Sequence, residues 1–313
     1  MAETPLVFPS VEAQRLEHHL PPLFTDHGED GSSSPKLPFV TLTFATSLDS
    51  ALSLGPGIRT VLSGPQSKAM THHLRSRHDA ICVGVGTALA DDPGLNCRLA
   101  SEYPTLETSP AADTAGVGAL LGLAGKAAGS ERRNTFTTHQ PRPIIIDPKL
   151  RWDFTAESKV LQLARIGRGL APYIVTAVPH PPERRRKLLE RLGGKFIVLG
   201  GPQGKGSEKD SESQRFDWHT ILAAVRDEGL RSIMIEGGGG VINSFLSEEN
   251  AHLIDSVIVT VAPTWLGQGS VYVSPPRKTG SDGKPRAVAR LTNTSWMPLG
   301  EDVVLCGKIA PQS

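Results

Sequence analysis

The chain has 313 residues, in which 33 lysines and arginines balance 32 aspartates and glutamates to a formal net charge of +1. This balance excludes the strong positive field that draws proteins to nucleic acids or to anionic membrane surfaces. The three cysteines are scattered without a Cys-x-x-Cys pair, which indicates neither a disulfide framework nor a zinc site and favours a reducing, cytoplasmic compartment.

Residues 1–37 are rich in proline, serine, glutamate and glycine and contain few groups that could bury apolar surface. We therefore expect a largely disordered segment, apart from a short helix at residues 11–20. The first residues show neither the basic start nor the apolar stretch of a signal peptide, and no apolar run reaches the roughly 20 residues of a membrane-spanning helix. We expect no membrane segment.

From residue 38 onward, short β-branched runs such as FVTLTFATSL, AICVGVGTAL, SIMIEG and SVIVTVAP alternate with helical patterns. Such apolar runs, separated by helices, are typical of a mostly parallel sheet covered on both faces. We predict an α/β fold with a mostly parallel central sheet flanked by helices, in a single domain at residues 38–313. Two segments of biased composition, at about 102–140 and 200–214, are predicted to be surface insertions.

The predicted helix SKAMTHHLRSRH carries two adjacent histidines and an arginine, Arg75. His72 and His73 point about 100° apart on a helix and have no cysteine or acidic partner at metal spacing, so we interpret them as solvated and predict no metal site. Arg75 and Arg98 could together clamp a phosphate, because a guanidinium binds phosphate oxygens through paired hydrogen bonds. Each arginine alone is also compatible with a surface charge.

Thr87 and Asp91 follow the predicted strand that begins at Ala80, just before the turn Asp92-Pro93-Gly94. Open α/β sheets bind ligands where strands give way to such loops. We therefore consider both side chains candidates for ligand contact.

The run SIMIEGGGGVIN is the strongest single feature. A buried strand ends in Glu236, four glycines let the backbone approach a ligand closely, and the helix from Val241 presents unpaired N–H groups to an anion. This order predicts a phosphate-binding loop, although the G-x-G-x-x-G fingerprint is absent. The alternative interpretation is a flexible turn that binds no ligand.

Five segments in order, TLTFATSLD, LRSRHDAICVGVGTALADDPGLNCR, PRPIIIDPKLRW, SIMIEGGGGVIN and DSVIVTVAPTWLG, resemble riboflavin-biosynthesis reductases of the fungal and archaeal type. Those are 2,5-diamino-6-ribosylamino-4(3H)-pyrimidinone 5′-phosphate reductases, similar to the reductase half of bacterial bifunctional deaminase-reductases. The resemblance covers about residues 38–309, apart from the two insertions. It implies a dihydrofolate-reductase-like fold and a homodimer.

The same resemblance implies an NADPH-dependent hydride transfer to C1′ of the ring-opened imine of a pyrimidine ribosyl phosphate, which yields the ribitylamino product. The positions that match the family's cofactor contacts are Thr87, Asp91, Gly238, Gly239, Gly240, Val241 and Asn243. The positions that match its substrate contacts are Arg75, Leu95, Arg98 and Glu236. We further expect Glu236 to act as a catalytic residue that helps protonate the imine, because partial burial raises a carboxyl pKa toward a useful value.

Two alternatives stay open. The chain could be an NADPH reductase that acts on another pteridine- or pyrimidine-like substrate, since fold alone does not fix the substrate. It could also be a non-catalytic regulatory protein that binds NADPH. The zinc deaminase signature, His-x-Glu with Pro-Cys-x-x-Cys, is absent from the sequence, so we expect reduction without deamination.

Overall fold

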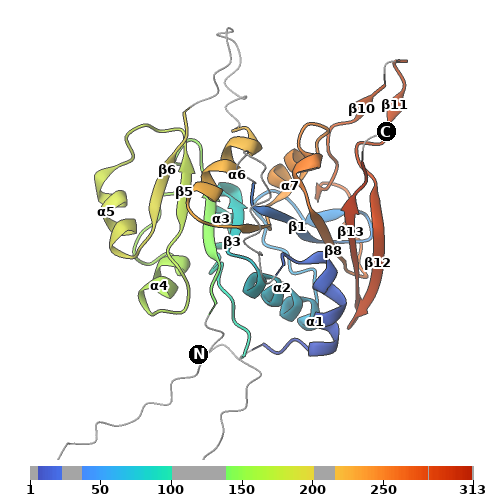
Figure 1. Ribbon diagram of the computed structural model, residues 1–313, viewed down its shortest axis with the longest axis horizontal. Helices are drawn as coiled ribbons and strands as arrows, with labels where there is room; N and C mark the ends of the chain where they lie inside the picture. Colours follow the sequence, from blue (N-terminus) through green and yellow to red (C-terminus); the bar gives the residue numbers. More distant parts are fainter. Residues whose placement is uncertain (1–5, 23–36, 101–138, 201–215, 281, 312–313) are drawn as a thin grey trace, which may run out of the picture.

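The computed structural model describes residues 6–22, 37–100, 139–200, 216–280 and 282–311. Within them, nine strands form one sheet in the order β12-β13-β8-β1-β7-β3-β4-β5-β6 (Figure 1). These strands are β1 (Phe39–Thr46), β3 (Ala80–Gly84), β4 (Arg142–Ile146), β5 (Tyr173–Thr176), β6 (Lys195–Val198), β7 (Ser232–Ile235), β8 (Ser256–Val261), β12 (Leu291–Leu299) and β13 (Asp302–Ile309). Two small ribbons pair β2 (Ala51–Ser53) with β9 (Val271–Tyr272) and β10 (Lys278–Thr279) with β11 (Pro285–Arg286).

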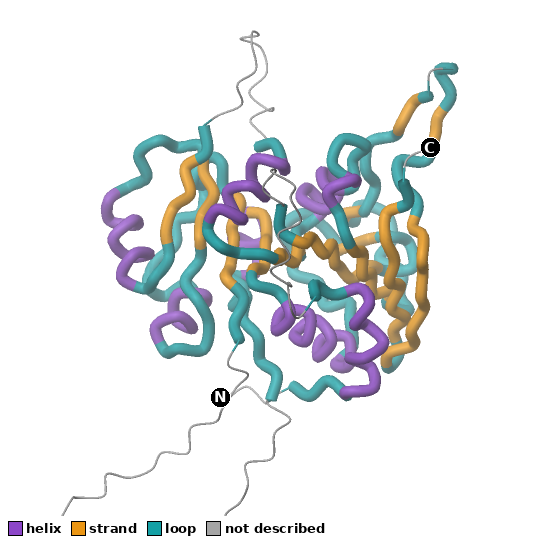
Figure 2. The backbone as a smooth tube through the Cα atoms, viewed as in Figure 1, coloured by secondary structure: helices purple, strands orange, loops and turns teal. Residues whose placement is uncertain are grey.

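Helices lie on both sides of this sheet (Figure 2). They are α1 (Ser10–Leu16), α2 (Pro65–Arg77), α3 (Val85–Asp91), α4 (Lys159–Arg165), α5 (Glu183–Arg191), α6 (Trp218–Asp227) and α7 (Gly239–Phe245), with short 3₁₀ turns at Glu17–His19 and Ala251–Leu253. None of the helices in the described ranges is long and apolar enough to cross a membrane.

The sheet is parallel from β8 to β6, and only the β12–β13 hairpin runs antiparallel beside β8. This arrangement confirms the predicted α/β class with a mostly parallel central sheet flanked by helices. Because parallel strands end at the same edge, the segments after β1, β3, β7 and β8 meet there, and we call this edge the carboxyl edge.

The alternation of side chains along β7 determines the face of the sheet on which the Glu236 side chain lies. Ile233 and Ile235 belong to the core cluster under α6 and α7, whereas Met234 belongs to the cluster under α1 and α2. Glu236 follows Met234 by two positions, and its main-chain N–H continues the pairing by donating to Cys82 at 2.9 Å. Its side chain therefore extends to the face that α2 covers.

The segment at residues 6–22 packs against this α2 face. Phe8, Leu16 and Leu20 are buried, and Leu6 pairs with Leu99 as an isolated parallel bridge. Each fully buried side chain of this size contributes about 1.5–3 kcal/mol, which explains how three apolar residues order a stretch that its composition favours as disordered. The rest of the predicted N-terminal segment, and nearly all of both predicted insertions, lie outside the described residues.

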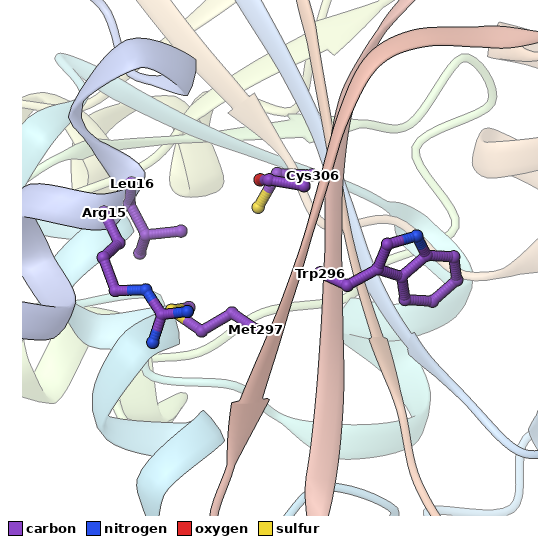
Figure 3. Close-up of a pocket in the computed structure, with 6 residues that line it drawn as sticks. Arg15, Leu16, Trp296, Met297 and Cys306 are labelled. Atoms are coloured by element: carbon purple, nitrogen blue, oxygen red, sulfur yellow. The ribbon is translucent and has the colours of Figure 1, made fainter.

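A cavity of about 200 Å³ lies between α1 and the β12–β13 hairpin (Figure 3). Arg15, Leu16, Ser295, Trp296, Met297 and Cys306 line it. In Figure 3 the Trp296 indole points away from Leu16 and Met297, on the other side of its strand, and 60% of the residue is exposed. None of the ligand-contact residues predicted from the sequence lines this cavity.

Candidate functional site

An ion pair between α2 and the end of β7 occupies the centre of the candidate site. Arg75 Nε donates to Glu236 Oε1 at 2.9 Å, and Arg75 Nη2 donates to Glu236 Oε2 at 2.6 Å. Arg75 Nη1 also donates to the main-chain oxygen of Asn96 at 3.1 Å. The Arg75 guanidinium thus joins α2, the end of β7 and the segment after α3.

This pair is largely shielded from water, with side-chain exposures of 15% for Arg75 and 16% for Glu236. Burial alone would lower the pKa of Arg75, but the charge and hydrogen bonds of Glu236 outweigh it, so the pKa of Arg75 is raised. Three of the five guanidinium N–H groups are engaged by Glu236 and Asn96. Arg75 therefore holds Glu236 in place, whereas the sequence predicts only a ligand contact for it.

His72 lies one helical turn before Arg75 and is only 2% exposed, so the prediction that it is solvated is wrong. Its Nδ1 lies 3.1 Å from the main-chain nitrogen of Arg98, and its Nε2 lies 3.2 Å from Arg98 Nε and 3.0 Å from Arg98 Nη2. The segment after α3 packs over this helix face and removes the ring from water. The i,i+3 spacing of His72 and Arg75 is the one sequence signal that places them on a common face.

The segment from Asp92 to Arg98 crosses α2 in an unusual backbone conformation. Asp92 and Leu95 have φ values of 39° and 49°, in the left-handed region that few side chains adopt. The Asp92 carboxylate accepts the main-chain N–H of Lys159 at 3.1 Å, which ties this segment to the start of α4. The Leu95 side chain is buried in the core beside Val83 and Ile145, so only its main chain could touch a ligand.

The four glycines after Glu236 divide into two kinds. A Cβ at Gly237 would lie 2.3 Å from the Val241 Cβ, and a Cβ at Gly239 would lie 2.6 Å from the Val271 Cγ1. Packing therefore requires these two glycines. Gly238 and Gly240 are exposed, and a Cβ at Gly240 would meet nothing within 4 Å. Their main chain is what the loop offers to a ligand.

Two predicted cofactor contacts, Thr87 and Asp91, lie on α3. A Cβ at Gly238 would lie 3.3 Å from Thr87 Oγ1, which places Thr87 against the glycine loop. Asp91, one turn later on α3, has a buried Oδ1 without a hydrogen-bond partner among the described residues. A buried carboxylate oxygen without a donor is costly, and a bound hydroxyl or amide would supply one.

Val241 and Asn243 serve the packing of the same loop. Val241 lies against Gly237 and Gly84, and a Cβ at Gly84 would lie 2.9 Å from the Val241 Cγ2. The Asn243 amide donates to the main-chain oxygen of Tyr272 at 3.0 Å and accepts the main-chain N–H of Ser274 at 2.7 Å. Asn243 thus fastens the chain after β9 to α7.

No group of three or more histidine, cysteine, aspartate or glutamate side chains could hold a metal ion in the part of the chain that the structure describes. The candidate site is therefore built from one ion pair, a buried histidine beside a second arginine, and a loop with exposed glycine main chain. His72 and Arg75 lie on α2, Arg98 lies in the segment after α3, and Glu236 and the glycine loop connect β7 to α7.

Comparisons with known proteins agree on one family. The model of the RibD C-terminal domain matches residues 38–305. The 2,5-diamino-6-ribosylamino-4(3H)-pyrimidinone 5′-phosphate reductase of Eremothecium gossypii is 36% identical over 279 residues, which span 89% of this chain and 91% of the relative. Its Debaryomyces hansenii counterpart is 34% identical over 273 residues, 87% of this chain and 90% of the relative. A solved structure of the Saccharomyces cerevisiae riboflavin biosynthesis reductase Rib7 aligns with a TM-score of 0.62 at 29% identity and covers 96% of this chain and 99% of that one.

Proposed function

The chain belongs to the RibD C-terminal domain family, and we propose that it reduces 2,5-diamino-6-ribosylamino-4(3H)-pyrimidinone 5′-phosphate with NADPH. It is an oxidoreductase of the pyrimidine reductase type. In the proposed reaction a hydride adds to C1′ of the ring-opened imine, a proton from solvent adds to the imine nitrogen, and the ribitylamino product results. Relatives named for this substrate align over nearly their whole length, which supports the assignment.

One structural observation carries the proposal. The Arg75–Glu236 pair joins α2 to the end of β7, and Arg75 also binds the segment that leads to Arg98. Arg75 therefore links Glu236 to the segment from Leu95 to Arg98, which contains the other two positions that match the family's substrate contacts. An arginine that served only as a solvated surface charge would not make such buried contacts. The contacts therefore favour the interpretation that both arginines belong to a binding site.

The described residues fit a dinucleotide cofactor. The orphaned Asp91 Oδ1 offers an acceptor to a ribose or amide donor, and the exposed main chain at Gly238 and Gly240 allows close approach of a phosphate. When bound, NADPH supplies the hydride from its nicotinamide ring. The protein's task is then to hold the reacting carbon about 3–3.5 Å from the hydride donor and to exclude water.

Arg98 is assigned to the substrate's 5′-phosphate, because a guanidinium matches phosphate oxygens in geometry and charge. Glu236 is assigned to accept hydrogen bonds from the sugar hydroxyls or the aminopyrimidinone. Both of its oxygens already accept from Arg75, an arrangement that suits an acceptor better than a proton donor. The proposal therefore replaces the expected imine protonation by Glu236 with substrate orientation.

Steady-state kinetics with the purified protein test this function. The proposal requires loss of NADPH absorbance when the pyrimidinone phosphate is added, with a lower kcat/KM for NADH assayed in parallel. Tight NADPH binding without oxidation would instead identify a regulatory protein, and oxidation only with a non-phosphorylated pteridine would identify another substrate. Homodimeric assembly and a cytoplasmic location belong to the same proposal and rest on the family resemblance and the cysteine pattern.

A further inference from the structure

His72 contacts the Cys97–Arg98 segment in three ways. Its Nδ1 faces the main-chain N–H of Arg98, and its Nε2 faces Arg98 Nε and Nη2. Its main-chain oxygen accepts from Cys97 Sγ at 3.3 Å. The ring is thus placed between α2 and the residue to which the substrate's phosphate is assigned.

The contacts that Nδ1 and Nε2 of His72 make with Arg98 cannot both be hydrogen bonds at the same time. A neutral imidazole has one N–H and one accepting nitrogen, whereas the main-chain N–H and the guanidinium of Arg98 are both donors. Burial first, and then the positive charges of Arg75, Arg98 and Lys68, lower the pKa of His72 to about 2, against a smaller opposing effect of the Asn96 main chain. The ring is therefore neutral near pH 7, and its single lone pair serves one donor of Arg98 at a time.

The main-chain N–H of Arg98 and its guanidinium are held in different ways. Its main-chain N–H is fixed by the fold, since Arg98 follows the buried residues Leu95 to Cys97. Its guanidinium lies at the end of several rotatable bonds and can turn toward an anion. When the proton is on Nε2, Nδ1 accepts from the main chain, and the guanidinium faces an N–H that repels it.

We propose that His72 is a positioning residue for Arg98. Its Nδ1 anchors the Arg98 main chain and, with the ring proton on Nε2, the ring does not compete with the phosphate of the substrate for the Arg98 guanidinium. This inference rests on the proposed function, because the phosphate belongs to the proposed substrate. His72 itself is too buried to touch the ligand.

Two substitutions of His72 distinguish the role of Nδ1 from the role of Nε2. An asparagine amide places its oxygen near the position of Nδ1, whereas a glutamine amide reaches the position of Nε2. His72→Asn should keep the main-chain anchor and leave KM for the pyrimidinone phosphate within about threefold of wild type. His72→Gln should raise that KM by about tenfold, the equivalent of 1.4 kcal/mol, with kcat changed less than about threefold. A KM that is equal in the two variants overturns the inference.

A spectroscopic measurement tests the tautomer without relying on activity or on a substitution that could impair folding. Nitrogen-15 NMR of histidine-labelled wild-type protein distinguishes a protonated from an unprotonated ring nitrogen, and ribose 5-phosphate serves as the probe. The inference requires the His72 ring to carry its proton on Nε2 in the saturated complex. A proton on Nδ1 there overturns it, since the main-chain anchor would then be lost.

The two hypotheses fail in different ways. Wild-type protein that does not oxidise NADPH with the pyrimidinone phosphate contradicts the proposed function. If wild-type protein oxidises NADPH with the pyrimidinone phosphate, but His72→Asn and His72→Gln have the same KM and the same melting temperature as each other, only the role of His72 is contradicted. A purely structural histidine would lower the melting temperature in both variants and leave the difference in KM between them at zero, which also contradicts the positioning role.

Discussion

Arg75 and Glu236 are joined by two hydrogen bonds of 2.9 and 2.6 Å, although 161 positions separate them in the chain. The pair connects α2 to the end of β7 on the face that alternation along β7 selects for Glu236. The orientation of Glu236, the proposed substrate contact, therefore depends on Arg75.

Replacing Arg75 with alanine leaves the Glu236 carboxylate shielded from water without its partner. We expect the free energy of unfolding to fall by about 1.5–3 kcal/mol and kcat/KM to fall by a similar free-energy equivalent, the range for hydrogen bonds to charged groups. Urea denaturation and steady-state kinetics measure the two effects. Arg75→Lys is the matched control, since it keeps the charge and loses the paired geometry, and it should recover less than half of kcat/KM. Wild-type kinetics in Arg75→Ala would remove the pair from the site.

The glycine loop allows stability and binding to be separated. Gly237→Ala places a methyl group against Val241 and should destabilise the fold by about 1–3 kcal/mol. Gly240→Ala meets nothing in the protein and should leave the melting temperature unchanged or slightly raised, while it raises KM for NADPH. Thermal unfolding and kinetics on both variants check this. Equal effects of the two substitutions on NADPH binding would contradict the division of the glycines.

Asp91 should show a trade-off between stability and binding. Its buried Oδ1 has no partner among the described residues, so Asp91→Asn is expected to leave the free energy of unfolding unchanged or to raise it slightly. The Kd for NADPH should rise by about tenfold, which corresponds to about 1.4 kcal/mol. Calorimetric titration with NADPH measures the affinity. An unchanged Kd would mean that Asp91 does not contact the cofactor.

The burial of His78 makes the free energy of unfolding depend on pH. It is fully buried, its Nδ1 donates to Leu74 O at 2.7 Å, and its Nε2 accepts from Thr41 Oγ1 at 2.8 Å. Burial is the main cause that lowers its pKa from 6.5 to about 4. Because the unfolded chain binds this proton more readily, the stabilisation is complete above pH 6.5 and is lost as pH falls toward 4.

Between pH 7 and pH 5 we expect His78 to account for a loss of about 2 kcal/mol in the free energy of unfolding. Urea denaturation across this interval measures the loss in wild type, in His78→Gln and in His219→Gln, which replaces an exposed histidine. The slope should become shallower in His78→Gln, where the lowered pKa values of His72 and His73 still contribute, and should be unchanged in His219→Gln. Identical slopes in all three proteins would exclude His78 as the cause.

Periodicity predicts the α/β fold because the parallel strands are short apolar runs buried on both faces, as β7 illustrates. It does not predict the burial of His72, since the segment that covers this ring arrives from more than 20 residues further along the chain. A helical pattern at residues 11–20 predicts a helix close to α1, but α1 itself buries only Leu16, with Phe8 and Leu20 buried on either side of it. Long-range packing of this kind leaves no local signal.

The candidate site follows the same rule. Glu236 and the glycine run stand out in the sequence, because a strand, a carboxylate and four glycines are adjacent in the chain. The pairing of Glu236 with Arg75 and the use of Gly237 for packing against Val241 depend on three-dimensional contacts. The sequence therefore predicts the segments of the candidate site, and the structure shows which of their positions are required for packing.

The most direct test of the proposed function follows the hydride itself. The purified protein is incubated with the pyrimidinone phosphate and with NADPH that carries deuterium at the transferable position of nicotinamide C4. The proposed function requires one deuterium per molecule of product, located at C1′ of the ribitylamino chain by NMR and mass spectrometry. Product without deuterium at C1′, or no product while the cofactor binds, would contradict it.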